Sequence, residues 1–501
     1  MKTRFTTKFK ANLYTSFAGL NTSRSDISME RPEAQPFVEM DNLYCSSKGF
    51  LTNESPIEPV QTEERQFISH FRFLNADTGV GLYAARSADG TSLRSLARPD
   101  KLEKVWPKDV SVTTTLFNSK VIVAGGQDKL ISYDGTEFKD ITSKAIEGGR
   151  YVVQVQNRLA VAGFSKNPNE IHVSRVNNEN LFSTDEDSAS TSVLRGFRFN
   201  VQNLIGNGDR IRGISPYEAN KFAIFTSDRV LVYLADPDLT LWTIDTRVVV
   251  RYGTVSHKSI VSVGDELYFC SRAGVHSLRR SSLNGNTVFT LPMSDEIQEL
   301  YQTLLEDVRN QEDISAYFNP DEGRLHIFFP INDLISYRLS AALTPAMAED
   351  QVARVRWSLT TFAGTTCGDN IAGRTVYGSI SGLYRVNQWF SNNGKRGNGF
   401  AQTPILWHKD LFNPKIGYYL VVYASGAGRI RVLAEDETSR QLGEYIFDLP
   451  DDDQADFTGV PLQRQFTRPF PHEYVGVRLR IFLESDKMIR VFGIGILNKE
   501  I

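Results

Sequence analysis

Residues that could do chemistry are few and far apart in this chain. The closest two of its seven histidines, His257 and His276, are 19 residues apart, so no local histidine pair has the spacing of metal ligands. The motifs GxxxxGK[ST], GxGxxG, HExxH and GxSxG, which mark phosphate loops, zinc hydrolases and serine hydrolases, do not occur. We therefore predict no catalytic, cofactor-binding or metal-binding residue and expect a protein that is not an enzyme.

Two groups of acidic residues are the alternatives to that expectation. Oxygen ligands for a hard cation could come from Asp451–Asp453 and Asp456, but this run lacks the alternating ligands and the glycine of a calcium loop, so a solvated loop is the better interpretation. Glycosidases bring carboxylates from different β-sheets to one place. Burial and mutual repulsion there raise the pKa of one carboxyl group above that of the other, so that one serves as the acid and the other as the base. The candidates for such roles are Asp236, Asp238, Asp265 and Glu266.

Paired basic residues in loops are candidates for contact with a partner. Arg279–Arg280 and Lys395–Arg396 could each touch phosphate or an acidic neighbour. The simpler interpretation is that they keep a loop in water. Of these we retain Lys395 and Arg396 as possible interface residues.

Composition and charge exclude several classes of protein. The 501 residues are 41% hydrophobic and 23% charged, which predicts two or three folded domains. Because 56 Lys and Arg face 59 Asp and Glu, no basic face or tail for tight phosphate binding is evident. The longest mostly apolar run, Ile416–Ala424, has less than half of the ~20 residues of a membrane helix. We expect no cleaved signal, and three scattered cysteines favour a reducing compartment.

The elements that must position any site are predicted to be β-strands. From residue 61 to 403, short runs of Val, Ile, Tyr, Phe and Thr alternate with Asn, Asp and Gly turns, as half-buried antiparallel strands require. Six turn residues recur at intervals of 39 to 63 residues, close to one propeller blade with its loops. The turn residues are Asn118, Asn157, Asn220, Asp265, Glu322 and Gly373.

This repeat predicts an all-β fold whose main domain is a β-propeller. Each small sheet has two apolar faces and must stack between neighbours, which a closed ring achieves. We expect six blades, with seven possible because a hairpin in Phe71–Leu96 could form another unit or complete the last blade. The alternative is a pair of β-sandwiches whose hairpins happen to be evenly spaced.

Three further segments surround or interrupt the repeat. An amphipathic helix is predicted near 294–309, with Ser294 as N-cap and an apolar stripe that either docks on a partner subunit or, preferably, covers its own blade. Residues 404–501 predict a C-terminal β-sandwich-like domain. Residues 1–60, with four prolines, predict an extended N-terminal arm or edge strand. The possible interface residues of the helix are Ile297, Leu300, Tyr301 and Leu304.

Four short segments together resemble a known family. Asp41–Tyr44 and Gly49–Thr52 are followed much later by Gly253–Val261, which runs into Leu267–Val275. This arrangement, with the alternating strands near Val477–Ile496, resembles the propeller-type tail nozzle and packaged-DNA-stabilisation proteins of short-tailed bacteriophages.

The resemblance implies a structural virion protein of the phage tail, assembled in the host cytoplasm. It implies a homo-oligomeric ring, most often a hexamer, below the portal and adaptor proteins. Such a ring retains the genomic DNA and then conducts it through the lumen without sequence-specific binding, beside tail fibres or tail tip proteins. From the residues themselves, which carry no cofactor motif and no long apolar run, we expect no cofactor and no stable membrane insertion. The alternatives are a propeller glycosidase or lyase and a soluble propeller scaffold that binds cellular proteins.

Overall fold

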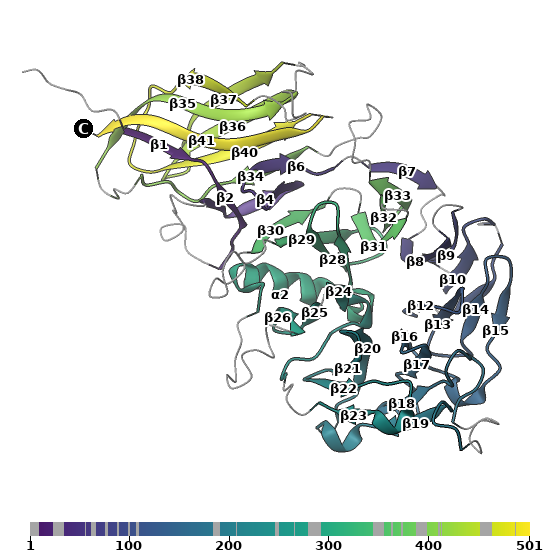
Figure 1. Ribbon diagram of the computed structural model, residues 1–501. Coiled ribbons are helices and arrows are strands. Elements are labelled where there is room, and N and C mark those ends of the chain that lie inside the picture. The colour runs from purple at the N-terminus through teal and green to yellow at the C-terminus, as the bar shows by residue number, and fades with distance from the viewer. Residues whose placement is uncertain are drawn as a thin grey trace, which may run out of the picture.

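The computed structural model is built almost entirely of β-strands, with one α-helix among the residues described (Figure 1). Within that part of the chain, no helix is long and apolar enough to span a membrane. The structure describes residues 10–23, 35–55, 57–61, 67–75, 79–87, 90–98, 101–106, 110–183, 191–206, 208–245, 250–264, 266–278, 292–343, 355–361, 364–371, 374–386, 398–408, 411, 413–450, 463–485 and 487–500.

Among the described residues, seven antiparallel sheets form the propeller, and we number them in ring order. Sheet 1 contains β8 (Phe67–Asn75), β9 (Val80–Ser87), β10 (Gly90–Ser95) and β11 (Lys104–Trp106), and sheet 2 contains β12 (Thr113–Phe117), β13 (Lys120–Ala124), β14 (Ile131–Tyr133) and β15 (Phe138–Asp140). Sheet 3 contains β16 (Tyr151–Val155), β17 (Arg158–Ala162), β18 (Glu170–Val173) and β19 (Phe197–Asn200). Sheet 4 contains β20 (Ile211–Tyr217), β21 (Lys221–Thr226), β22 (Val230–Leu234) and β23 (Thr243–Ile244). Sheet 5 contains β24 (Val261–Val263), β25 (Glu266–Ser271) and β26 (Gly274–Ser277). Sheet 6 contains β27 (Ser315–Asn319), β28 (Arg324–Pro330), β29 (Ser336–Leu343) and β30 (Val355–Thr360). Sheet 7 contains β31 (Thr365–Ile371), β32 (Arg374–Ser379), β33 (Gly382–Val386) and β7 (Ile57–Gln61).

The first strands of the sheets line the axis of the ring. β8 contacts β12, β12 contacts β16, β16 contacts β20, and the series returns through η6 (His257–Ser259), β27 and β31 to β8. Apolar residues of adjoining sheets form shared clusters, such as Ile122 with Leu159 between sheets 2 and 3. The β-propeller expected from the turns is therefore confirmed.

The ring closes through a strand from the N-terminal segment. β7 pairs antiparallel with β33, Ile57 opposite Val386, and supplies the outer strand of sheet 7. Pro59 in this strand fits an edge position, because proline has no amide hydrogen to donate to a further strand. The covalent start and end of the propeller thus meet within one sheet.

The turn spacing undercounted the sheets. It favoured six units, whereas the described part of the propeller contains seven sheets. The Phe71–Leu96 hairpin forms β8, β9 and β10 of a separate sheet, and it does not complete the last sheet because β7 already occupies that edge. Asp265 and Gly373, two of the six turn residues, lie outside the described residues.

The C-terminal domain contains two β-sheets packed face to face. Alternate residues of β40 are buried, so that Leu479 and Ile481 enter the same core as Leu420 and Ile494 of the facing sheet. One sheet contains β38 (Arg464–Pro469), β35 (Lys415–Gly426), β41 (Ile489–Glu500), β6 (Leu51–Asn53), β5 (Leu43–Cys45), β1 (Lys10–Tyr14) and β39 (Glu473–Tyr474). The other contains β37 (Gln441–Leu449), β36 (Gly428–Asp436), β40 (Val477–Glu484), β34 (Gly399–Gln402) and β4 (Glu39–Asp41).

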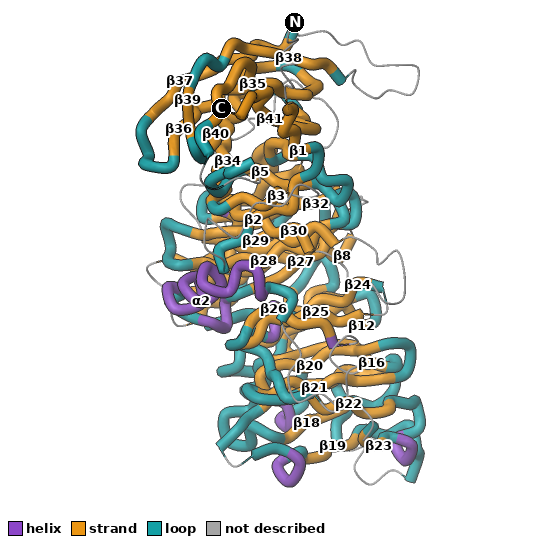
Figure 2. Tube along the Cα trace, turned by 90° about the vertical axis from the view of Figure 1, so that its left-hand side faces the viewer, coloured by secondary structure: helices purple, strands orange, loops and turns teal. Residues whose placement is uncertain are grey.

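The N-terminal segment belongs to both domains. β1, β4, β5 and β6 pair within the C-terminal sheets, while β7 belongs to the propeller. The described part of residues 1–60 is therefore woven into the fold and is not a free extended arm. A short parallel pair, β2 (Phe17–Leu20) and β3 (Gln35–Phe37), lies against β30. Figure 2 shows the C-terminal domain at one end of the propeller.

Helical turns occupy the connections between strands. The α-helix α2 (Gln298–Asp307) lies beside the hairpin of β25 and β26 (Figure 2). Its first turn is continuous with η7, in which Ser294 does not cap the helix as expected but accepts a hydrogen bond from the Val275 amide at 3.0 Å. The 3-10 turns are η2 (Lys144–Ile146), η4 (Gln202–Leu204), η5 (Leu239–Leu241), η6, η7 (Asp295–Ile297) and η8 (Gln311–Asp313).

Candidate functional site at the propeller axis

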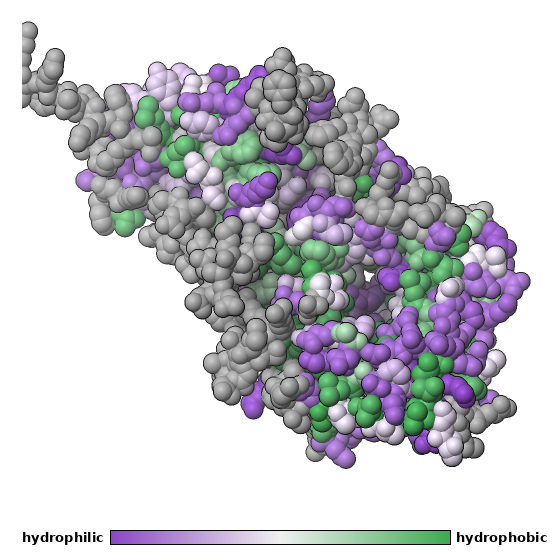
Figure 3. All heavy atoms as spheres, in the orientation of Figure 1, coloured by the Kyte–Doolittle hydropathy of each residue, from purple (hydrophilic) through white to green (hydrophobic). Residues whose placement is uncertain are grey.

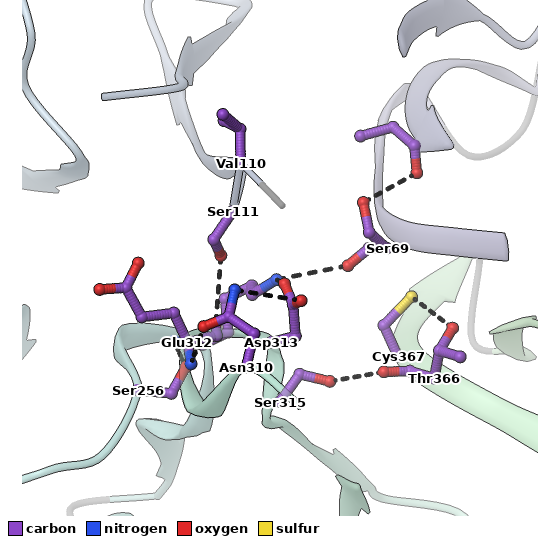
Figure 4. Close-up of polar contacts among 12 residues, drawn as sticks. Ser69, Val110, Ser111, Ser256, Asn310, Glu312, Asp313, Ser315, Thr366 and Cys367 are labelled. Carbon is purple, nitrogen blue, oxygen red and sulfur yellow. Dashed lines mark hydrogen bonds and ion pairs between the residues drawn. The ribbon is translucent and has the colours of Figure 1, made fainter. Parts of the chain in front are cut away.

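One short turn brings two carboxylates to the place where the inner strands meet. Asn310 caps η8, accepting a hydrogen bond from the Glu312 amide at 3.1 Å. The Glu312 carbonyl in turn accepts hydrogen bonds from Ser111 at 3.1 Å and Ser256 at 3.0 Å (Figure 4). Because these serines precede the inner strands of sheets 2 and 5, the turn lies at the axis and is held from several sides.

Asp313 is the buried member of the pair of carboxylates. Its Oδ1 lies 3.2 Å from Lys258 Nζ, and its Oδ2 is ion-paired with Arg86 of β9. All three side chains are at most 4% exposed. Lys258 also donates to the Ser69 carbonyl at 3.5 Å, on the inner strand of sheet 1. The Asp313 carboxylate therefore connects the start of sheet 6 to sheets 1 and 5.

Glu312 extends the same arrangement to two more sheets. Arg150, just before β16, lies 3.1 Å from Glu312 Oε1, and Arg212 of β20 lies 3.6 Å from the same atom. We call Glu312, Asp313, Arg86, Arg150, Arg212 and Lys258 the axial cluster. Four cations from four sheets thus converge on two carboxylates of the segment that enters sheet 6.

Hydrogen bonds between adjacent inner strands surround the axial cluster. Thr113 donates to the Arg150 carbonyl at 2.7 Å, joining sheets 2 and 3. Ser315 donates to the Thr366 carbonyl at 2.9 Å, joining sheets 6 and 7 (Figure 4). The Thr366 hydroxyl donates to the Ile68 carbonyl of sheet 1. These contacts join sheet 2 to sheet 3, and sheet 7 to sheets 6 and 1, close to the axis.

Two buried histidines beside the cluster stay neutral. Burial, and then the Lys258 ammonium, lowers the pKa of His257 to about 4 and that of His70 well below its ordinary value. His257 Nδ1 accepts from the Ile214 amide at 3.3 Å, and its ring lies 5.2 Å from that of Tyr151. A neutral imidazole adds no further positive charge to a cluster already rich in cations.

The lowered pKa of His257 predicts how the free energy of unfolding depends on pH. Between about pH 6.5 and pH 4 the unfolded chain binds a proton at His257 and the folded chain does not, so the free energy of unfolding falls as the pH falls. In His257→Asn we expect that dependence to be shallower by up to about 1.4 kcal/mol per pH unit. Urea unfolding at several pH values measures it.

Tyr151→Phe is the control for this prediction. It keeps the ring beside His257 and removes a hydroxyl whose pKa burial raises to about 12, far outside this range. The Tyr151→Phe and wild-type curves should be parallel. A His257→Asn curve parallel to both would contradict the assignment.

A second buried ionic group joins the N-terminal segment to sheet 6. Arg324 donates to both oxygens of Glu54 at 2.9 Å, and Arg338 approaches Glu54 Oε2 at 2.8 Å. The ring of Tyr44 lies 3.8 Å from the Arg324 guanidinium carbon. Burial alone would raise the pKa of Glu54, but the two guanidinium groups hold it below its ordinary value.

The predicted interface residues of the helix lie inside the chain. Ile297, Tyr301 and Leu304 are buried, and Leu300 is half-buried against the same core. Tyr301 donates to the Ser271 carbonyl at 2.6 Å and meets the ring of Phe329 in sheet 6. The apolar stripe thus covers its own sheets. Lys395 and Arg396 lie outside the described residues.

The candidate acid and base residues serve local structure. Asp238 caps η5 by accepting from the Thr240 amide at 2.8 Å, and Asp236 accepts from the Asp238 amide. Glu266 accepts from Tyr268 at 2.8 Å within one hairpin. Outside the described residues lie Asp265, Asp451–Asp453, Asp456 and Arg279–Arg280. No group of three or more His, Cys, Asp and Glu among the described residues is arranged for a metal ion.

Sequence reasoning missed the axial cluster. Lys258 lies in one of the segments that carry the resemblance, but Arg86, Arg150, Arg212 and Glu312–Asp313 follow no recognisable spacing. The one available signal was the polar Asn310–Asp313 run shortly before the half-buried strand β27.

Comparison with known proteins identifies no family for this chain. No family model and no curated protein matches it. The extracellular domain of a one-component system from B. thetaiotaomicron is similar at 8% identity and TM-score 0.39, covering 82% of this chain and 48% of its own length. This chain therefore spans about half of that neighbour.

Two shorter structures are similar over most of their length. Hsv2 from Kluyveromyces lactis has 14% identity and TM-score 0.34, covering 65% of this chain and 97% of its own. BamB from Moraxella catarrhalis has 11% identity and TM-score 0.32, covering 71% and 95%. The sheets themselves carry the conclusion on fold: the chain is a β-propeller joined to a C-terminal β-domain.

Proposed function

We propose that this protein is a structural component of the tail of a short-tailed bacteriophage. Copies of the chain form a ring, most often of six, below the portal and adaptor proteins. The ring belongs to the tail nozzle or tail tube of the virion and is assembled in the host cytoplasm. It retains the packaged DNA and then conducts it during ejection, without enzymatic activity or a cofactor of its own.

The observation that carries this proposal is the axial cluster. Asp313 and Glu312 are held by cations from sheets 1, 3, 4 and 5, so the propeller is cross-linked at its axis. Carboxylates committed to such ion pairs are poor candidates for general acids or bases, which must exchange a proton near neutral pH. The arrangement favours a rigid building block over a catalyst.

The N-terminal segment supports the same role. Its strands enter both the propeller and the C-terminal domain, so the two domains are fixed by one piece of chain. A rigid connection of this kind suits a part that must transmit load within an assembly.

The segments that carry the family resemblance have structural positions. Leu43–Cys45 and Leu51–Asn53 are the paired strands β5 and β6. A β-carbon at Gly253 would overlap the Thr226 carbonyl oxygen, so this glycine permits close contact between sheet 5 and sheet 4. Motifs with such positions support the relation to a structural family.

The charge of the chain fits a conduit for DNA. A formal net charge of −3 leaves little surplus of cations to hold the phosphates of a passing genome. In this proposal DNA moves along a bore bounded by several copies, and the axis of each propeller belongs to the wall.

Electron microscopy and mass photometry of the purified full-length chain, alone and co-expressed with the products of neighbouring genes, test the proposal. We expect rings of symmetry-related copies with an open central bore. A chain that stays monomeric under both conditions would favour the soluble scaffold. Cleavage of a polysaccharide that is lost in Glu312→Gln would favour the glycosidase or lyase.

A further inference from the structure

A broad polar groove lies between sheets 2 and 3, apart from the axial cluster. Its volume is about 1020 Å³. The loops that form it connect β13 to β14, β15 to β16, and β17 to β18, and the strands β18 and β19 contribute side chains to its wall. Neither the axial cluster nor the predicted interface residues take part in it.

Two buried polar side chains of β18 form the back of the groove. Glu170 and His172 point to the same side of the strand, and their side chains are 11% and 6% exposed. Glu170 accepts a hydrogen bond from Asn167 at 2.9 Å and pairs with Arg198 of β19 at 3.1 Å. The ring of Phe164 holds the His172 ring edge to face at 4.9 Å. The wall is therefore preorganised before any ligand arrives.

Unused hydrogen-bonding capacity remains in this wall. A carboxylate has about four acceptor positions and a guanidinium has five donors. The side chain of Arg198 is 53% exposed and forms an ion pair with Glu170 through one of its nitrogen atoms. Glu170 and Arg198 together can thus accept from and donate to neighbouring hydroxyl groups of one ligand.

Two lysines line the groove at its exposed part. Lys144 of η2 and Lys166 are exposed, and neither forms an ion pair with any residue that the structure describes. The charged lining comprises Lys144, Lys166, Arg198, Glu147 and Glu170, a net charge of one positive. An anionic group on the ligand would be attracted to the lysines, while a bare anion would be repelled by Glu170.

These features restrict the chemistry of the ligand. Phe164 is 7% exposed, so it offers no open ring face on which a nucleobase could stack. The polar wall disfavours an apolar ligand. Hydroxyl groups suit Glu170, Asn167 and Arg198, and an acidic group suits the lysines. We propose that this groove binds an acidic saccharide, with its acidic group near Lys144 and Lys166 and its hydroxyls on Glu170 and Arg198.

Calorimetric titration of the full-length chain tests the proposal with three probes. Trigalacturonate and 3′-sialyllactose carry the required acid and hydroxyls, and lactose is the neutral counterpart of the second. We expect at least one acidic probe to bind with a Kd below about 1 mM, and lactose to bind at least tenfold more weakly. Failure of both acidic probes to bind at 10 mM, a roughly tenfold margin over that limit, overturns the proposal.

Variants distinguish this site from a nonspecific anion site. Lys144→Ala combined with Lys166→Ala should weaken binding at least tenfold, and Glu170→Gln should weaken it at least fivefold, since each removes charge-assisted hydrogen bonds. Lys48→Ala, an exposed lysine in a distant loop, is the matched control and should bind as the wild type does. The double lysine variant decides the matter if Glu170→Gln fails to fold.

Inorganic phosphate provides the opposing outcome. Phosphate that displaces the probe completely, together with unchanged affinity in a folded Glu170→Gln, would show a simple anion site and overturn the saccharide assignment. The titration uses the isolated chain, so its result is independent of whether copies assemble into a tail ring.

Discussion

Replacement of Asp313 by alanine is expected to lower the free energy of unfolding by about 3–5 kcal/mol. Its carboxylate neutralises Arg86 and Lys258, both nearly fully buried. Removing it deprives Lys258 of the carboxylate 3.2 Å away and leaves Arg86 with the more distant carboxylate of Asp333 at 3.8 Å, at an axis where water cannot readily replace the lost partner. Urea unfolding of the full-length chain, followed by tryptophan fluorescence and circular dichroism, measures the loss.

Two further variants separate charge from packing at this position. Asp313→Asn keeps the shape but removes the charge, and should lose nearly as much stability as Asp313→Ala. Glu137→Ala breaks an exposed ion pair with Lys139 and should change stability by less than about 1 kcal/mol. An Asp313→Ala protein within 1 kcal/mol of the wild type, a difference of about fivefold in the unfolding equilibrium, would show that the axial cluster does not hold the sheets together.

Glu54→Gln is expected to cost about 3–5 kcal/mol at pH 7, because it leaves the buried Arg338 without the Glu54 counter-charge and makes Arg324 depend on Glu322 for its own. The folded pKa of Glu54 is lower than its unfolded value, so its contribution is complete above the unfolded pKa of about 4.3 and is lost as the pH falls toward the folded pKa. The difference between wild type and Glu54→Gln should therefore shrink below about pH 4.

Glu58→Gln provides the matched control for Glu54. Glu58 lies in the same N-terminal segment and pairs with Arg385 at 3.1 Å, but the Arg385 side chain is 44% exposed. This variant should lose less than about 1 kcal/mol. Unfolding curves at pH 7, 5 and 3 decide the question. A Glu54→Gln loss that is small at pH 7, or equal at all three pH values, would contradict the role given to the buried pair.

Local patterns predicted the elements well. Alternation along Val477–Ile481 predicted a strand with one apolar face, and Val477, Leu479 and Ile481 are buried as expected. The helical spacing of Ile297, Tyr301 and Leu304 predicted the helix that the structure contains over η7 and α2. In both cases the pattern reflects burial of one side of a regular element, which residue order alone encodes.

Pairing over long distances was not predictable in the same way. The expectation of an edge strand for the proline-containing N-terminal segment agrees with β7, but its partner β33 lies more than 300 residues away in sequence. A strand pattern states which face is buried and does not name the neighbouring strand. The predicted number of six sheets was wrong for the same reason. The hairpin in Phe71–Leu96 could be assigned to a sheet of its own only after β7 was known to be the outer strand of sheet 7.

The sequence by itself determined that this is an all-β chain of short, half-buried strands without a recognised catalytic motif. Only the tertiary structure decided that Glu312 and Asp313 meet Arg86, Arg150, Arg212 and Lys258, which come from four sheets. The physical reason is that strand formation depends on neighbours along the chain, whereas convergence at an axis depends on closure of the whole ring. Charges that are ordinary loop residues in the sequence become an ionic cross-link once the last sheet meets the first.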